Sequence, residues 1–228
     1  MKTICYVDGF NLYYGCLKQT SFKWLDLDLL LRSLLIEQNP QTELIQVKYF
    51  TADIKAQLAS HGVAAHQAQQ AQQDYQRALA LRMGSRLKIV KGFHSLTKSS
   101  MLSYEVPPSK AKRVDVWRLE EKETDVNIAL EAFRDAVSNT ADQLVFVSND
   151  SDLAPIFRSI REESLSIKIG VIFPILRQAD HASRPGNVTL SGLADWTRRY
   201  FHANELACAQ LPLMIPTKRK PIKKPAHW

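Results

Sequence analysis

The chain has 228 residues, of which 45% are hydrophobic and 23% are charged, and its formal net charge is +7. This composition suits one globular domain and excludes a wholly disordered chain. No apolar run approaches the ~20 residues of a membrane span. The three cysteines are widely spaced, which excludes a disulfide framework and a cysteine-rich zinc site. We therefore expect a protein of the reducing cytoplasm with no membrane partner.

The positive charge is concentrated near residue 228. Residues 217–225 hold five cations and no acid, which leaves +2 for the rest of the chain. A basic excess favours an anionic partner such as nucleic acid. We expect one folded domain over residues 1–216 and a basic, disordered tail over residues 217–228. The tail is either a nonspecific electrostatic anchor or a plain disordered terminus.

Strand and helix patterns alternate along the chain. Apolar runs predict strands over residues 3–7, 44–50, 86–92, 144–147 and 168–173. Helical patterns cover residues 12–17, 26–37, 54–83 with a break at Gly62, a segment starting at Thr124, a segment after Asp152, and residues 190–200. This alternation predicts an α/β fold with a mostly parallel central sheet flanked by helices on both faces.

Residues 93–117 interrupt the alternation, and we interpret them as a long loop or hairpin insertion. Such insertions are often functional. Phe93 and Tyr104 are suited to stacking on unpaired bases. The alternative is a solvated basic surface. The cations expected to bind phosphates are Lys98, Lys110, Lys112 and Arg113.

Two aspartate sites follow predicted strands. Asp8 comes directly after the first strand, and Asp150 and Asp152 come after the fourth. Ligands of open α/β sheets bind at the carboxyl ends of the strands, so Asp8 and Asp150 converge if their strands are neighbours. Each aspartate alone more often serves as a turn or helix-cap residue, and Asp152 in particular fits a cap for the helix near Leu153.

A third aspartate site, Asp125, lies at the start of a helix, where Thr124 is a suitable N-cap. Counted from Asp125, the positions +3, +4, +7, +8, +11 and +12 are all apolar, so Asp125 is predicted on the stripe that faces the sheet. Residues Asn127, Glu131, Arg134 and Ser138 are predicted on the opposite, exposed face. A buried carboxylate needs a partner, and a divalent cation shared with Asp8 and Asp150 would supply one.

The chemistry of that cation follows from its ligands. Mg²⁺ and Mn²⁺ prefer oxygen ligands, and in phosphodiester hydrolysis such ions activate water and stabilise charge on the attacking and leaving oxygens. The residues therefore predict a metal-dependent nuclease with Asp8, Asp125, Asp150 and Asp152 at its site. Mg²⁺ and Mn²⁺ are not distinguished by such a site, because both suit carboxylates.

Three segments together resemble the NYN domain family, a LabA-like branch of the PIN-like nucleases. They are residues 7–12 (VDGFNL), 121–129 (EKETDVNIA) and 147–155 (VSNDSDLAP), and they stand in the family's order. The resemblance runs from about Lys2 to about Pro212. It implies a three-layer PIN-like fold of the Rossmann-like type and endoribonuclease activity on single-stranded or structured RNA. Relatives often pair, so a homodimer is an open alternative to a monomer.

The resemblance also assigns roles to individual residues. Asp8, Asp125 and Asp150 become metal ligands with Asp152 assisting, and Asn11 orients Asp8 or the phosphate. Ser148 and Asn149 line the turn that precedes Asp150. Thr124 stands where the family often has Gly, and Ser148-Asn149 stands where many relatives have Ser-Gly; neither change removes an acid.

Rival functions are distinguished by single residues or by experiment. A phosphatase of the haloacid-dehalogenase type needs a second Asp where Phe10 stands, and neither glycine-rich phosphate-binding pattern occurs. The remaining alternative is an RNA-binding or regulatory module that keeps the fold and cleaves little or nothing. DNA also remains open as a substrate, since no residue identified contacts a 2′-hydroxyl.

Overall fold

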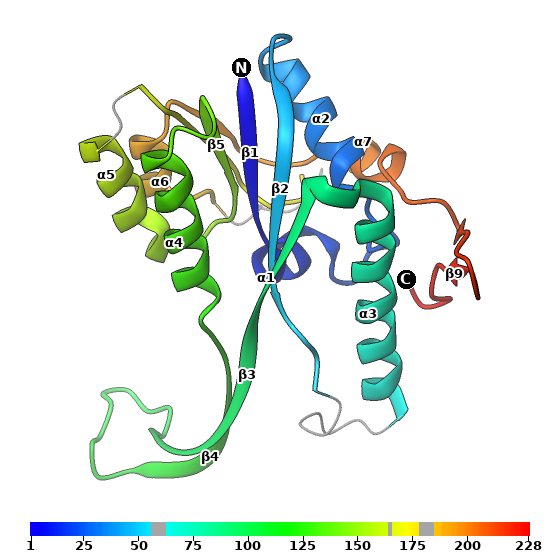
Figure 1. Ribbon diagram of the computed structural model, residues 1–228. Helices are drawn as coiled ribbons and strands as arrows, with labels where there is room; N and C mark the ends of the chain where they lie inside the picture. Colours follow the sequence, from blue (N-terminus) through cyan, green and yellow to red (C-terminus); the bar gives the residue numbers. More distant parts are fainter. Residues whose placement is uncertain (56–62, 164–165, 178–184) are drawn as a thin grey trace.

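The computed structural model describes residues 1–55, 63–163, 166–177 and 185–228 (Figure 1). Its centre is a seven-stranded sheet of order β4-β3-β2-β1-β5-β6-β7. Every neighbouring pair in it is parallel except β3 and β4. The strands are β1 (Lys2–Asp8), β2 (Glu43–Ala52), β3 (Leu87–Leu102), β4 (Arg113–Lys122), β5 (Gln143–Val147), β6 (Lys168–Ile172) and β7 (Trp196–Arg198).

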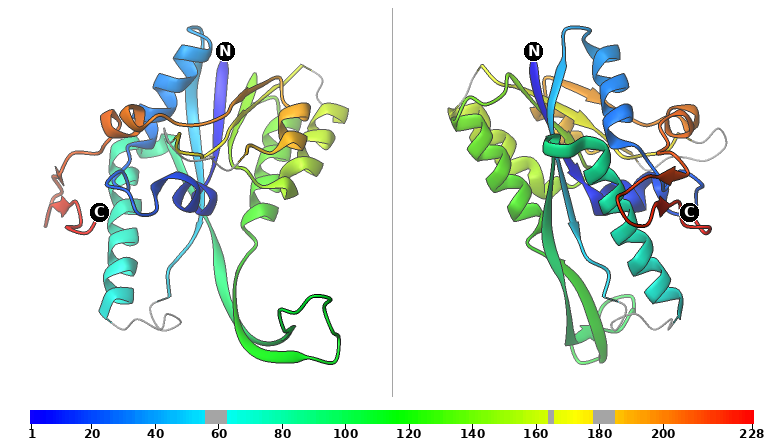
Figure 2. Two further views of the ribbon diagram at one scale, coloured as in Figure 1. Left: turned by 180° about the vertical axis from the view of Figure 1, so that it is seen from behind. Right: turned by 45° about the vertical axis from the view of Figure 1, so that its right-hand side comes forward.

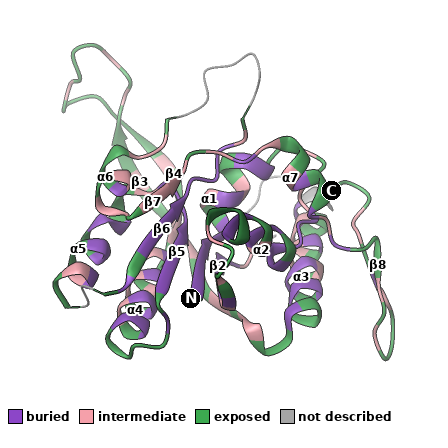
Figure 3. Ribbon diagram, turned by 90° about the horizontal axis from the view of Figure 1, so that it is seen from above, coloured by how far each residue is buried: buried purple, intermediate pink, exposed green. Residues whose placement is uncertain are grey.

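Helices cover both faces of the sheet, as the views of Figures 2 and 3 show. One face packs against α4, α5 and α6, and the other against α2, α3 and α7. The helical elements are α1 (Gly9–Leu12), the π-helical turn η1 (Tyr13–Leu17), α2 (Leu27–Gln38), α3 (Val63–Met83), the 3₁₀ turn η3 (Gly84–Arg86), α4 (Thr124–Val137), the 3₁₀ turn η4 (Ser151–Leu153), α5 (Ala154–Glu163), α6 (Val188–Leu193) and α7 (Ala203–Cys208).

Strand β1 shows why the sheet lies between two layers of helices. Cys5 and Val7 are buried in the core beneath α2 and α3, while Ile4 and Tyr6 are buried in the core beneath α4 and α5. Side chains of a strand point alternately to opposite faces, so an apolar strand with no polar alternation must be covered on both sides. The predicted α/β fold with a mostly parallel sheet is confirmed.

Two predicted helices differ from the structure. Helix α3 begins at Val63, and the part of the predicted helix over residues 56–62 lies outside the described residues. The helix predicted over residues 190–200 is wrong beyond Leu193, because the chain then forms β7 beside β6. The Trp196 indole occupies the space that a side chain at Gly170 would fill, and its Nε1 donates to Gln143 Oε1 over 3.0 Å.

The insertion predicted over residues 93–117 is a β-hairpin and not a loop. Residues 87–92 of β3 pair with β2, and residues 93–102 then leave the body and pair with β4. The resulting arm projects from the carboxyl edge of the sheet (Figure 1). It is solvated on both faces, so its polar sequence has little of the apolar alternation that predicts strands.

The basic segment near residue 228 has a defined structure, which corrects the expected disordered tail. Strand β8 (Met214–Ile215) pairs antiparallel with β9 (Ile222–Lys223), and Ile222 is buried. The Trp228 ring lies 5.5 Å from that of Tyr75 and 6.1 Å from that of Trp24, measured between centroids. Residues 217–228 therefore pack on the domain. None of the described helices is both long and apolar enough to cross a membrane.

Candidate active site

The carboxyl edge of the sheet brings two of the predicted acids together. Strand β1 lies directly beside β5, so Asp8 at the end of β1 neighbours the turn that follows Val147. The Ser148 hydroxyl joins the two strand ends: it donates to Asp8 Oδ2 over 2.9 Å and accepts from the Asp150 amide over 3.1 Å. The expected adjacency of the two strands is thus confirmed.

Asp8 is held rigidly in a buried position and is only 2% exposed. Its Oδ1 accepts from the Asn11 amide over 2.9 Å, and its Oδ2 accepts from Asn11 Nδ2 over 2.7 Å. Burial raises the pKa of Asp8, an effect that the hydrogen bonds from Asn11 and Ser148 partly offset and that the nearby Glu121 charge increases. Asn11 therefore orients Asp8 and also favours its charged form.

Gly9 allows the chain to turn sharply after Asp8. A Cβ at this position would lie 2.6 Å from the Phe50 carbonyl oxygen and 2.8 Å from the Tyr49 hydroxyl. Both distances are too short for a carbon atom, so a side chain at residue 9 would push α1 away from β2. Gly9 thus lets Asn11 reach back to Asp8.

Asp125 occupies the first turn of α4, with its side chain half-buried. The expected Thr124 cap is wrong: Thr124 is the first residue of the helix and its hydroxyl donates to the Glu121 carboxylate, while the cap is Glu123 with a left-handed φ of 73°. Burial, and then the charges of the other acids at this edge, raise the pKa of Asp125 to about 6. Those acids, in order of effect, are Asp8, Asp150, Asp152 and Glu121.

The turn after β5 uses its polar residues in different ways. Asp150 caps η4, because its Oδ1 accepts from the Asp152 amide over 3.0 Å. Asp152 itself lies in the first turn of η4 and is exposed. The Asn149 amide points to the segment before α6, accepting from the Asn187 amide over 2.8 Å and donating to the Pro185 carbonyl over 3.3 Å. Asn149 thus ties this turn to α6.

The acids at this edge have no cationic partners among the residues that the structure describes. Within the described part of the chain, Lys, Arg and His form no ion pair with Asp8, Asp125, Asp150, Asp152 or Glu121. The described part of the chain also includes no group of three His, Cys, Asp or Glu side chains already close enough to hold one metal ion. The acids therefore share a region of uncompensated negative charge without converging on a single point.

Glu121 is a member of this group that the sequence analysis missed. It lies on β4 opposite His94, four residues before Asp125, and it raises the pKa of both Asp8 and Asp125. Its place in the segment EKETDVNIA was the available signal, but that segment alone does not show on which side of a solvated hairpin a side chain lies.

A second group of acids on α4 corrects the predicted helix face. Glu131 was expected to be exposed, yet it is buried, and Lys48 Nζ on β2 lies 2.7 Å from Glu131 Oε2 and 2.5 Å from Asp135 Oδ2. The Tyr6 hydroxyl also donates to Asp135, and Lys88 Nζ lies 2.8 Å from Glu131 Oε2. The buried side of α4 is therefore rotated from the predicted stripe toward these acids, leaving Val137 exposed.

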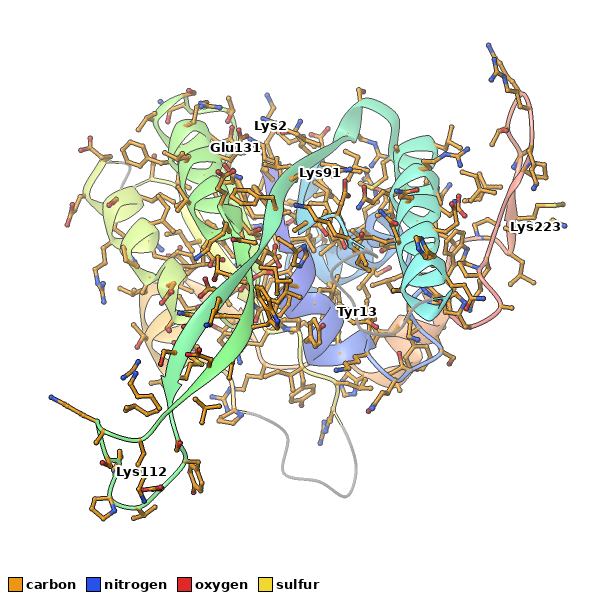
Figure 4. The ribbon with its side chains drawn as sticks, turned by 90° about the horizontal axis from the view of Figure 1, so that it is seen from below. Lys2, Tyr13, Lys91, Lys112, Glu131 and Lys223 are labelled. Carbon is orange, nitrogen blue, oxygen red and sulfur yellow. The ribbon has the colours of Figure 1, made fainter. Side chains whose placement is uncertain are left out.

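The predicted phosphate-binding cations lie along the hairpin, and several already have acidic or polar partners. Lys98 pairs with Asp115 at 2.7 Å and Lys112 pairs with Glu105 at 3.0 Å. Arg113 donates to the Ser100 carbonyl, and Lys110 lies between the two strands of the arm. Figure 4 shows Lys112 at the far end of the arm, well away from Tyr13 near its base.

The fold and this edge together define an α/β protein with a mostly parallel sheet and a group of acids at its carboxyl edge. The chain matches the NYN domain family over residues 2–184, and it belongs to that family. It is 35% identical over 245 aligned residues to 6-hydroxy-3-succinoylpyridine 3-monooxygenase HspA of Pseudomonas putida, covering all of this chain and 75% of that protein. A solved protein of unknown function from Vibrio parahaemolyticus is 16% identical, with a TM-score of 0.45 and coverage of 89% of this chain and 94% of that one.

Proposed function

We propose that this protein is a metal-dependent endoribonuclease of the PIN-like type that hydrolyses RNA phosphodiester bonds. The observation that carries the proposal is the group of acids at the carboxyl edge, which pair with no cation among the described residues; burial and the neighbouring carboxylates raise the pKa of Asp125 to about 6. A region of repelling carboxylates is unfavourable for folding alone and would repel a polyanion. A divalent cation removes both objections.

The donor set fits Mg²⁺ or Mn²⁺ in chemistry, since all candidate ligands are carboxylate oxygens. Asp8, Asp125 and Asp150 would hold the ion, with Asp152 and Glu121 beside them. Held there, a divalent ion would supply an activated water and stabilisation of charge on the scissile phosphate. Since three carboxylates do not converge in the described geometry, Asp125 and Asp150 would have to turn toward Asp8 on binding.

The protein's own residues then have separable tasks. Asn11 and Ser148 hold both oxygens of Asp8 and so fix the buried acid of this edge. The exposed rings Phe93 and Tyr104 on the hairpin offer stacking surfaces for bases, and Lys110 offers a phosphate contact. RNA would thus lie along the arm with one phosphate at the acids. We place this activity in the cytoplasm and leave open whether two chains pair.

The test is cleavage of a labelled single-stranded RNA in Mn²⁺, in Mg²⁺ and in EDTA, with single-stranded DNA in parallel. Asp125→Asn and Asp150→Asn should each reduce metal-dependent cleavage at least 100-fold, since each removes a ligand. Asp74→Asn is the matched control, because Asp74 lies on α3 and pairs with Arg77. Cleavage that persists in both site variants would overturn the assignment.

The same experiment addresses the binding-module alternative. RNA that binds without being cleaved in any metal would favour a regulatory protein that keeps the NYN fold. Binding that weakens steeply with salt would then reflect phosphate contacts.

A second candidate function is hydroxylation of a pyridine ring, favoured by the 35% identity to HspA over the whole chain. A monooxygenase puts one oxygen atom of O₂ into its substrate and reduces the other to water, so it needs an electron donor. The test is oxidation of a reduced nicotinamide cofactor on addition of 6-hydroxy-3-succinoylpyridine, followed by product analysis. Substrate-dependent oxidation with a hydroxylated product, together with no RNA cleavage, would replace the nuclease proposal.

A further inference from the structure

A cavity of about 220 Å³ opens beside the acids, between the α1–η1 segment, β2, α3 and the Trp228 end of the chain. Its walls include six aromatic rings from four distant parts of the sequence. Figure 4 shows Tyr13 on the α1–η1 segment, at the base of the hairpin. The lining rings are Phe10, Tyr13, Tyr14, Tyr49, Tyr75 and Trp228.

The inner rings are fixed in place by the core. Tyr49 and Tyr75 are buried, their centroids lie 6.4 Å apart, and the Tyr75 hydroxyl donates to the Leu25 carbonyl over 2.9 Å. Trp228 packs against Tyr75, and Lys23 Nζ donates to the His227 carbonyl over 3.3 Å, which holds this end of the chain against the body. The aromatic walls are therefore preorganised and lose little rotamer entropy when a ligand binds.

The outer rings form the mouth of the cavity. Phe10 and Tyr14 lie 4.4 Å apart, and Lys18 Nζ sits 4.7 Å above the Tyr14 ring. Both aromatic side chains are about half exposed, although large apolar rings are usually covered in a monomeric domain. An exposed aromatic pair beside an aromatic cavity offers faces on which a planar ring stacks.

One edge of the cavity is polar, and it belongs to the acidic site. Glu121 lines the cavity and also raises the pKa of Asp8 and Asp125. His94 lines the same edge with its Nδ1 3.2 Å from the Asp53 carbonyl, which fixes the plane of the imidazole. A bound ring can therefore meet the Glu121 carboxylate and an imidazole at the edge that the cavity shares with the acidic site.

We propose that this cavity binds one planar heteroaromatic ring and places the group attached to it at the acidic edge. Pockets for drug-sized ligands measure roughly 300–1,000 Å³, so about 220 Å³ suits a single ring system and not a larger ligand. The ring can come from a nucleotide, as its base, or from a free small molecule. Ring binding does not require phosphodiester cleavage, so the proposal stands apart from the nuclease assignment.

Calorimetric titration of the full chain with neutral ligands in EDTA tests this, since no metal or phosphate is then involved. We expect uridine or adenosine, or alternatively nicotinamide, to bind with a Kd below about 1 mM, and the saturated ring of cyclohexanecarboxamide to bind at least tenfold more weakly. Nucleoside binding alone would identify a base subsite, and nicotinamide binding alone a free small molecule. No binding by any aromatic ligand, or equal binding of the saturated ring, would overturn the proposal.

Variants locate the site. Trp228→Ala and Tyr14→Ala should each weaken binding about tenfold or more, as expected for loss of one stacking partner. Trp228→Phe should keep most of the affinity, and because Tyr14 is half exposed its variant should fold even if Trp228→Ala does not. Trp117→Ala, at an exposed indole on the hairpin outside the cavity, is the control and should change nothing. Equal affinity in Trp228→Ala, Tyr14→Ala and the control would place the ligand elsewhere.

Discussion

Helix α4 carries acids in two settings that differ in what neutralises them. Near its middle, burial would raise the pKa of Glu131, but Lys48 and Lys88 outweigh burial and lower it to about 2. In its first turn, burial and four neighbouring acids raise the pKa of Asp125 to about 6. Two carboxylates on one helix, six residues apart, are thus shifted in opposite directions.

The contrast separates acids that hold the fold from acids available for chemistry. Lys48 is 3% exposed and reaches α4 from β2, so its ion pairs fix the helix on the sheet. That attachment also sets where the first turn of α4, and with it Asp125, meets the carboxyl edge. The buried cation thus positions Asp125 without touching it.

Removing the buried cation should have the largest effect on stability. Lys48→Met leaves Glu131 and Asp135 buried without their shared partner, and breaking a buried ion pair in this way costs about 3–5 kcal/mol. Lys88→Met is the matched control and should cost less than about 1 kcal/mol, since Lys88 is half exposed. Both are measured as the free energy of unfolding in urea.

A second substitution tests whether the lost stability comes from the unpaired buried charge. Adding Asp135→Asn to Lys48→Met should recover part of the lost stability, because the amide leaves less buried charge unpaired. If the free energy of unfolding of Lys48→Met lies within about 1 kcal/mol of wild type, the ion pairs of Lys48 do not fix α4 on the sheet.

Replacement of Asp125 should increase the stability at alkaline pH, whereas replacement of Lys48 decreases it. The pKa of Asp125 is 3.8 in the ordinary case and about 6 in the fold, so the folded state binds the proton more tightly. Stability from this group is therefore complete below pH ~4, falls as pH rises to ~6, and is lost above that. Asp125→Asn should be more stable than wild type by about 1 kcal/mol at pH 8, less than the full shift implies because the side chain is half exposed.

Urea midpoints from pH 4 to pH 8 in EDTA measure this difference. The Asn variant and wild type should coincide near pH 4 and diverge between pH 4 and pH 6. Titration of Glu131 lies at lower pH and occurs in both proteins, so it cancels. A pH-independent difference would show that the fold does not raise the pKa of Asp125.

The sequence predicts the acidic edge better than it predicts the attachment of α4. Asp8 and Asp150 follow apolar strands that must be buried, and in a parallel sheet the ends of such strands lie at one edge. The face of α4 is harder, since Ile128, Ala132 and Ala136 fit two rotations of the helix. Contacts from other strands decide between them, above all that of Lys48, which lies 83 residues before Glu131.

Contacts between residues distant in sequence also explain why the structure of residues 217–228 and the cavity could not be predicted. The segment of residues 217–228 is polar and basic, yet Trp228 meets Trp24 across the whole length of the chain. No local pattern signals that contact, and the cavity is likewise lined by rings from four separate segments. Glu121 escapes prediction because its strand is solvated on both faces and lacks apolar alternation.

The smallest expected change in stability is at the N-cap of α4. Glu123 adopts a left-handed φ of 73°, a conformation that costs a non-glycine residue about 1–2 kcal/mol. Glu123→Gly removes this strain but adds unfolded-state entropy, so a net gain of about 0.5 kcal/mol is expected. Glu123→Ala keeps the strained backbone and removes the same charge, so it is the control and should show no gain in thermal unfolding. Equal stability of the Gly and Ala variants would mean that α4 is entered without strain, and that Asp125 is positioned by the Lys48 attachment alone.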